Sequence, residues 1–333
     1  MHRRGIVLTP DPTNLYEAGG VLNPAAISYN NLTYIFYRAV AFKPHNYSRI
    51  LIASCNVNSD GTFENVRKMN KIALEPKESY ELWANGKGGG VEDPRITLID
   101  DTYYMTYVAY GTVDGKTAPR VALAKSKDLI TWLRMGLIHY TPVEIQKARG
   151  KKTYDLNKIP NKDAVIFPTK IGGMYAMLHR PMFKGSTHVK QSIWLAFSTD
   201  MMNWTDHTLV IEPRSGWESF KIGAGTPPLL LDEGWLVFYH GVDSNDKDPN
   251  RHYRAGVLIM DRKHPAKVLY RSDDPVLSPE NPEEKYGVVD NVVFPTGAVV
   301  NPAGFIEVYY GMADRAIGLA TTPISRVDSS PIK

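Results

Sequence analysis

The chain has 333 residues, 43% hydrophobic and 22% charged, which is sufficient for one large domain or two ordinary ones. Its formal net charge is only +4, with no basic block beyond the short segment Lys147–Lys152, which argues against nucleic acid as a partner. The single cysteine, Cys55, excludes an intrachain disulfide and favours a reducing compartment.

The N-terminal residues Met1–Gly5 lead directly into turn residues, without the apolar run of a signal peptide. No stretch of the sequence has the length and apolar character that a membrane span needs. We therefore expect a cytoplasmic protein that does not act at a membrane.

One unit recurs along the chain, with a turn, an aromatic-rich strand and a polar residue at the end of that strand. Its copies follow one another at intervals of roughly 60–70 residues, the spacing of a repeat architecture. In chain order they are Leu32–Arg38, Thr102–Tyr110, Met174–Arg180, Trp235–His240 and Phe305–Tyr310.

Each aromatic strand has the same two neighbours in the sequence. Proline-containing elements precede it, at Leu22–Pro24, Glu92–Arg95, Ile166–Pro168, Thr226–Pro228 and Phe294–Gly297. Short aliphatic strands follow it, at Arg49–Ser54, Arg120–Ser126, Ser192–Ser198, Arg254–Met260 and Ala316–Thr321. Five sets of about four strands predict an all-β fold, a five-bladed β-propeller forming a single catalytic domain over residues 1–333. The alternative, a pair of β-sandwiches, would show turns every 8–12 residues or so, without this longer period.

Helical periodicity is absent, apart from short turns that we expect near Val143–Arg149. The surrounding stretch Tyr140–Asn161 either covers the active site or forms a subunit contact, and the sequence does not choose between these.

Ligand sites in a propeller are built from corresponding positions of different blades, around the central channel. The candidates on inner strands are Asn23, Asp93 and Asp163, and those at the ends of aromatic strands are Arg38, Arg180, His240 and Asp314.

The segment Gly88–Arg95 is a first candidate for chemistry, because its glycines permit a close backbone approach and a Glu-Asp pair follows them. An ordinary acidic turn, in which Asp93 pairs with Arg95, is the structural alternative. Adjacent strand residues point to opposite faces, so we do not expect Glu92 and Asp93 to act together as an acid/base pair.

A second candidate is a set of side chains from several blades that together suit a dianion, phosphate by preference. They are Arg38, Lys162, Arg180 and His240, joined by Tyr253. We expect His179 to point away from this set and to be structural. Gly223–Gly225 lacks the Lys-Ser/Thr of a P-loop and predicts a tight approach of strands. The histidines are scattered, so we expect no metal site and no cofactor.

An ordered series of short motifs runs through essentially the whole chain. They are Gly90–Arg95, Lys162–Ala164, Phe167–Pro168, Leu178–Pro181, Lys221–Gly225, Tyr239–Gly241 and Tyr310–Asp314. This series resembles glycoside hydrolase family 130, a five-bladed propeller family. Its members are mainly phosphorylases of β-mannosides, with a smaller set of β-1,2-mannosidases.

The resemblance implies a role for each candidate. Asp93 corresponds to the single catalytic acid of the family. Lys162, Arg180, His240 and Tyr253 fall on its phosphate-binding positions, and Asn23, Arg38 and Asp314 fall on positions that hold mannose. Asp163, also a substrate-site residue, stands where some members carry a different polar residue. Glu92 at the substrate site points to the mannooligosaccharide branch, because another branch has tyrosine there.

The implied reaction is inverting phosphorolysis, which needs one carboxylic acid, whereas ordinary glycosidases need two. Asp93 would donate the proton, directly or through a mannose hydroxyl, and burial would raise its pKa. Phosphate, a co-substrate, would attack the anomeric carbon and give α-mannose 1-phosphate with a shortened sugar. β-1,4-linked mannooligosaccharides are the first expectation and β-1,2-linked ones the competitor. Hydrolysis and non-catalytic glycan binding remain alternatives, and family members are often homo-oligomers.

Overall fold

The computed structural model of the chain describes residues 1–42, 47–147, 150–183, 190–243 and 251–325. Strands dominate this part, and its helices are α1 (Pro282–Lys285) and the 3-10 turns η1 (Ser79–Glu81) and η2 (Leu156–Lys158). None of these helices has the length and apolar character needed to cross a membrane. The expected all-β class is confirmed.

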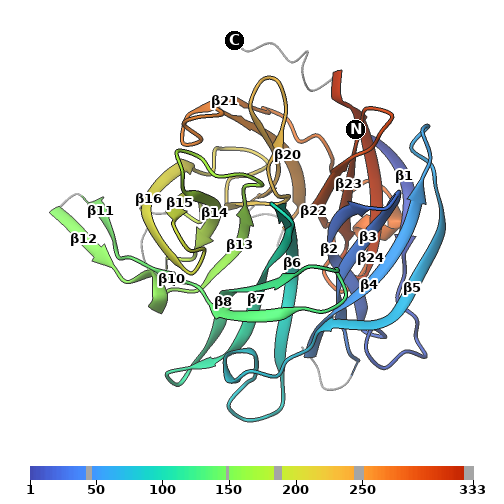
Figure 1. Cartoon of the computed structure of the whole chain (residues 1–333), viewed down its shortest axis with the longest axis horizontal. Coiled ribbons are helices and arrows are strands. Elements are labelled where there is room, and N and C mark those ends of the chain that lie inside the picture. Colours follow the sequence, from blue (N-terminus) through green and yellow to red (C-terminus); the bar gives the residue numbers. More distant parts are fainter. Residues whose placement is uncertain (43–46, 148–149, 184–189, 244–250, 326–333) are drawn as a thin grey trace.

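Hydrogen bonding arranges the strands in antiparallel sets that run from the middle of the molecule outward. In Figure 1, β2, β6, β13 and β22 lie towards the middle and β5, β16 and β21 towards the edge. The first set is β2 (Gly20–Tyr29), β3 (Leu32–Val40), β4 (Tyr47–Val57) and β5 (Phe63–Leu74). The second is β6 (Gly89–Ile99), β7 (Thr102–Val113), β8 (Lys116–Ser126) and β9 (Leu133–Leu137), and a short parallel pairing of β4 with β6 joins these two sets into one sheet.

The third and fourth sets each carry a short additional strand. The third is β13 (Asn161–Ile166), β14 (Tyr175–Pro181), β15 (Ile193–Ser198) and β16 (Asn203–Ile211), with β10 (His139–Tyr140) parallel to β16. The fourth is β17 (Lys221–Ala224), β19 (Trp235–Val242), β20 (Tyr253–Met260) and β21 (Val268–Arg271), with β18 (Leu229–Leu230) beside β19.

The last set joins the two ends of the described chain. It is β22 (Val293–Val300), β23 (Phe305–Met312) and β24 (Ala316–Pro323), completed by the N-terminal strand β1 (His2–Leu8). His2 of β1 lies opposite Thr321 of β24 in an antiparallel pair. This pairing lets the first and last strands share one sheet, in which β24 is covered on both sides and β1 forms the outer edge.

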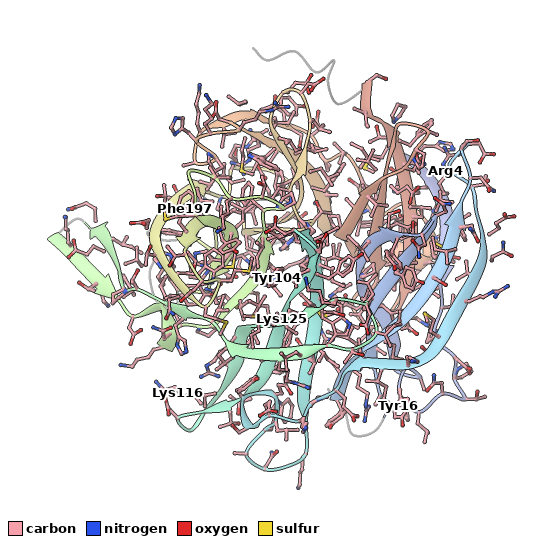
Figure 2. All side chains as sticks on the ribbon, in the orientation of Figure 1. Arg4, Tyr16, Tyr104, Lys116, Lys125 and Phe197 are labelled. Atoms are coloured by element: carbon pink, nitrogen blue, oxygen red, sulfur yellow. The ribbon has the colours of Figure 1, made fainter. Side chains whose placement is uncertain are left out.

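The apolar core lies in layers between neighbouring sets, and side chains fill the space between the sheets (Figure 2). Between the first two sets, for example, Phe36 and Ile52 pack with Val91 and Met105. Strands buried on both faces explain why the aromatic and aliphatic segments read as near-continuous apolar runs.

The stretch that we expected to contain short turns is a β-hairpin instead. Its strands β11 (Val143–Lys147) and β12 (Gly150–Tyr154) pair antiparallel and project from the left of the molecule in Figure 1. The expectation of turns was wrong for Val143–Lys147, because apolar Val143 and Ile145 alternate with polar residues at the period of a strand. Residues 148–149 lie outside the described part.

Bulges in three inner strands place the polar residues of the site. The pairing register shifts between Leu22 and Ala25, between Glu92 and Arg95, and between Lys162 and Val165. At these shifts Asn23, Asp93 and Asp163 have φ of 48°, 48° and 55°. Asn and Asp tolerate this left-handed region better than most residues, and a bulge redirects the side chain it carries. The three side chains therefore enter a common space.

Candidate active site

The bulged strands surround a cavity of about 200 Å³. It is lined by Asn23, Arg38, Asp93, Lys162, Asp163, Arg180, Met182, Lys221, His240, Tyr253, Val289, Val292, Phe294 and Asp314. Every residue that the sequence assigned to the site lines it, except Glu92. Glu92 is buried and contacts two of the lining side chains, Arg38 and Lys162.

One side of the cavity is acidic and centres on Asp93. The Asn23 amide donates to Asp93 Oδ1 at 2.8 Å, and Arg38 lies 3.4 Å from the same oxygen. Arg38 also donates to Glu92 Oε1 at 2.8 Å, and Lys162 Nζ lies 3.7 Å from Glu92 Oε2. The bulge at Asp93 breaks the alternation, so that both carboxylates reach Arg38, although only Asp93 lines the cavity. That Glu92 and Asp93 do not act together as an acid/base pair stays a prediction.

Arg95 donates its hydrogen bonds to backbone oxygens and not, as it would in an ordinary acidic turn, to the Asp93 carboxylate. Its guanidinium donates to the backbone oxygens of Asp93 at 2.8 Å and of Gly225 at 2.5 Å. Arg95 is buried and holds two strands together through their main chains. The Asp93 carboxylate is therefore left to Asn23, Arg38 and whatever enters the cavity.

The pKa of Asp93 also departs from the expectation. Burial opposes ionisation, but Arg38, Lys162 and Arg95 outweigh it and lower the pKa below its ordinary value. The expected rise was therefore wrong for the ligand-free protein, in which Asp93 is a carboxylate at neutral pH. The pKa of Asp314 is instead raised to about 6, since burial and the Asp93 charge outweigh the attraction of Arg38.

The opposite side of the cavity centres on Asp163 and its partners. Arg180 Nε donates to Asp163 Oδ2 at 2.5 Å, and His240 Nε2 lies 3.6 Å from that oxygen. Burial lowers the pKa of His240 to about 3, and the charges of Arg180 and Lys221 add to this effect. The set predicted as cationic is thus mixed, with a neutral imidazole and an embedded carboxylate.

Lys221 is the lining residue with a charge that sequence reasoning missed. Its Nζ lies 2.7 Å from Tyr253 Oη, and burial together with Arg180 lowers its pKa to about 7. Gly223–Gly225 was predicted to be a tight approach of strands, which Gly225 confirms, since a Cβ there would clash with the backbone oxygens of Pro295 and Phe238. The sequence feature that could have identified Lys221 is its position at the start of an inner strand, two residues before Gly223.

His179 points away from the cavity, as expected. It is fully buried, stacks on Tyr140 with ring centroids 5.2 Å apart, and its Nδ1 lies 2.9 Å from the Asn161 amide nitrogen. Its neighbour in the chain, Arg180, faces the cavity. This alternation is the ordinary one for a strand without a bulge.

The arrangement combines two chemical capacities in one cavity. Asp93 and Asp314 are carboxyl groups able to transfer a proton, and their neighbours drive the pKa values of the two apart. Arg180, Lys221 and Tyr253 offer donors suited to an anion. A small polar substrate between them would meet both.

Comparison with known proteins gives four findings, and each similar protein or family is named for a mannoside or mannan phosphorylase. Residues 8–328 match the family model Glyco_hydro_130, described as beta-1,4-mannooligosaccharide phosphorylase. The chain is 38% identical to a 1,2-beta-oligomannan phosphorylase of Thermoanaerobacter sp. (strain X514), over 94% of this chain and 93% of that protein. It is 31% identical to a beta-1,4-mannooligosaccharide phosphorylase of Ruminococcus albus, over 94% and 85%. A solved structure of beta-1,2-mannobiose phosphorylase from Listeria innocua superposes with a TM-score of 0.77 at 25% identity, covering 98% and 97%.

Proposed function

The chain belongs to glycoside hydrolase family 130, and from this premise we propose that it transfers β-linked mannosyl groups to inorganic phosphate with inversion. The products are α-D-mannose 1-phosphate and a sugar shortened by one unit. One observation carries the proposal: a single cavity is lined both by Asp93 and by the anion-binding donors Arg180, Lys221 and Tyr253. Hydrolysis needs a second carboxylate that activates water. Of the two other carboxyl groups that line the cavity, Asp163 is paired with Arg180, and we assign Asp314 to mannose binding.

Proton transfer is the role of Asp93. In the free protein its cationic neighbours keep it ionised. A phosphate dianion bound nearby adds a like charge, and the enclosed sugar excludes water, so both raise the pKa of Asp93 towards the protonated form. Asp93 then gives its proton to the glycosidic oxygen, directly or through a mannose hydroxyl. Asn23, Arg38 and Asp314 hold the mannose, with Glu92 orienting Arg38.

Phosphate binding is the role of the opposite side. Arg180 and Lys162 supply charge, Tyr253 and His240 supply hydrogen bonds, and Lys221 adds a further donor beside Tyr253. Asp163 is bound to Arg180 and lies beside His240, which orients these two side chains and argues against its acting as a base for water. No cofactor enters this scheme, and phosphate is the co-substrate.

The architecture that we propose is a five-bladed β-propeller, in one catalytic domain over residues 1–333. The antiparallel sets, the inner position of β2, β6, β13 and β22, and the pairing of β1 with β24 support it. A cytoplasmic location and assembly into homo-oligomers remain expectations.

Linkage is the finer part of the proposal, and the relatives support β-1,2-linked mannosides at least as well as the β-1,4-linked ones expected from the sequence. The 38% identical protein is named for 1,2-linked oligomannan, and the family model and the 31% identical protein for 1,4-linked oligosaccharides. We therefore propose β-1,2-oligomannosides as the first substrate to test and β-1,4-mannooligosaccharides as the second.

The deciding experiment measures phosphate release from α-mannose 1-phosphate with mannose, β-1,2-mannobiose or β-1,4-mannobiose as the acceptor. Release with one acceptor class, and its loss in Asp93→Asn, would support phosphorolysis and identify the linkage. Cleavage of mannosides that does not depend on phosphate would instead make the protein a hydrolase. Mannoside binding with no turnover in either direction would make it a glycan-binding protein.

A further inference from the structure

Three consecutive residues, Pro160 and the first two of β13, line three different cavities. Lys162 lines the active-site cavity, Asn161 lines a second cavity of about 190 Å³, and Pro160 lines a third of about 390 Å³. Arg120 and Ile159 line both the second and the third. Lys162 and Asn161 are neighbours in a regularly paired part of β13, so their side chains point to opposite faces and the first two cavities lie on different sides of the strand, within ~10 Å along it. Lys116, which also lines the third cavity, lies towards the lower left edge of the molecule in Figure 2.

The second cavity has an apolar wall and a polar floor. Val121, Leu137 and Leu156 contribute to the wall, and Tyr140 and Asn161 are buried residues of the floor. Exposed lining residues, such as His139, place its mouth at the surface. A ligand would therefore enter from solvent and meet the two buried polar side chains.

Those two side chains are left without full hydrogen bonding in the described part of the chain. Tyr140 is 6% exposed and Asn161 is 1% exposed, yet Tyr140 Oη and Asn161 Oδ1 have no partner there. The other amide atom of Asn161 contacts His179 Nδ1 at 2.9 Å, so turning the amide over would still leave one atom unpaired. Buried polar atoms are rarely left in this way, and such pairs mark a place where a polar ligand fits.

The other sets of strands have no such gap, because a buried glutamate accepts from a tyrosine of the second strand. The pairs are Glu17–Tyr37, Glu81–Tyr107, Glu218–Tyr239 and Glu284–Tyr310. In the third set His179 takes the tyrosine position, opposite the bulge of β13, and contacts Asn161. The third set thus has the amide of Asn161 and an imidazole where the second set has the carboxylate of Glu81 and a tyrosine.

We propose that the second cavity binds one neutral hexose unit of an oligosaccharide whose cleaved end occupies the active-site cavity. This rests on the proposed function. A sugar hydroxyl both donates and accepts, which matches Asn161 Oδ1, Tyr140 Oη and the Arg120 guanidinium together. Arg120 contacts only backbone oxygens in the described chain, at 3.3–3.5 Å, and retains capacity for a ligand. The apolar wall suits the carbon face of a pyranose.

The test compares β-linked mannobiose with mannotetraose in the wild type and in Tyr140→Phe. We expect KM for the tetraose to rise about tenfold in the variant, the effect of one lost hydrogen bond, with no change for the biose. Thermal stability should not fall, because the removed hydroxyl has no partner in the described chain. Tyr29→Phe, at an exposed tyrosine, is the matched control and should change neither KM.

Other outcomes would overturn the proposal. Equal effects on both sugars, or none on either, would mean that the cavity holds no sugar unit. A fall in thermal stability with unchanged KM would mean that Tyr140 Oη binds structural water. Calorimetric titration of mannotetraose into the wild type and into Tyr140→Phe tests binding in the second cavity independently of the proposed phosphorolysis. Length-dependent binding that Tyr140→Phe weakens would support the cavity even if no phosphorolysis were found.

Discussion

Neighbouring residues on the same strands face two polar layers of very different character. Arg38 and His240 face the active-site cavity, whereas the residues before them, Tyr37 and Tyr239, donate to buried glutamates at 2.9 and 2.7 Å. Both layers are buried and charged. They differ in how completely their carboxylates are paired.

Glu81 shows the fully paired condition and Asp93 the incomplete one. Glu81 accepts from Tyr107 at 2.8 Å, from Arg134 at 2.9 Å, and from the backbone amides of Lys77 and Glu78. Asp93 accepts from Asn23 at 2.8 Å and lies 3.4 Å from Arg38, on a backbone with φ of 48°. A carboxylate whose hydrogen-bonding positions are all filled stabilises the fold. A carboxylate on a strained backbone with unfilled positions is available to bind a ligand.

The largest effect should come from Asp93→Asn, which removes the proton donor and keeps the shape of the side chain. We expect kcat to fall on the order of 10²–10⁴-fold, the range of a general acid. The thermal midpoint should stay close to that of the wild type. Near-normal turnover would remove Asp93 from the mechanism, and circular dichroism would check the fold.

Glu81→Gln should produce the opposite pattern. It removes a buried charge that Arg134 pairs with, at a cost of about 3 kcal/mol in the free energy of unfolding. Turnover per folded molecule should be unchanged, because Glu81 does not line the cavity. Urea denaturation and active-site-normalised kinetics measure the two. Glu64→Gln, at an exposed glutamate, is the control and should change neither.

Tyr107→Phe should have a smaller effect on stability than Glu81→Gln. Removing its hydroxyl takes a donor from buried Glu81, and we expect a loss of about 2 kcal/mol in the free energy of unfolding. Tyr140→Phe removes an equally buried hydroxyl that has no partner in the described chain, and should cost close to nothing. Equal losses in parallel denaturation curves would contradict the distinction between the two sets.

The smallest expected effect is on how the free energy of unfolding depends on pH, through His179 in the third set of strands. Burial lowers the pKa of His179 well below 6.5, so the unfolded chain takes up a proton first as the pH falls. Stability should therefore decline below pH 6.5, by up to about 1.4 kcal/mol per pH unit for this residue. His240 acts in the same direction, between pH 6.5 and its folded value of about 3. Asp314, whose pKa is raised to about 6, counteracts the effect of both histidines below that pH, because the folded chain takes up its proton before the unfolded chain does.

Denaturation curves at pH 7, 6 and 5 would measure this decline. His179→Asn should flatten the slope by up to one proton, whereas His264→Asn, at an exposed histidine, should retain it. An unchanged slope in His179→Asn would show that His179 is protonated in the folded state.

Much of the fold and the site was predictable from local patterns. Short aromatic and aliphatic segments alternate along the sequence, separated by proline-containing elements. This local pattern favours short strands independently of what packs against them, and it predicted the all-β class. Short motifs such as Gly90–Arg95 and Lys162–Ala164 led to the family and to the lining residues Asp93, Lys162 and Asp163. The hairpin at Val143–Lys147 was missed because a short apolar alternation was taken for turns.

Tertiary structure alone decided how those residues work. The bulge at Asp93 turned its side chain towards Arg38, 55 residues away in the chain, and so lowered a pKa that burial alone would raise. Lys221 near Tyr253 and the unpaired atoms of Tyr140 and Asn161 likewise arise between separate strands. Strand propensity depends on near neighbours in sequence, whereas charge, desolvation and cavities depend on distances through space, which only the folded chain defines.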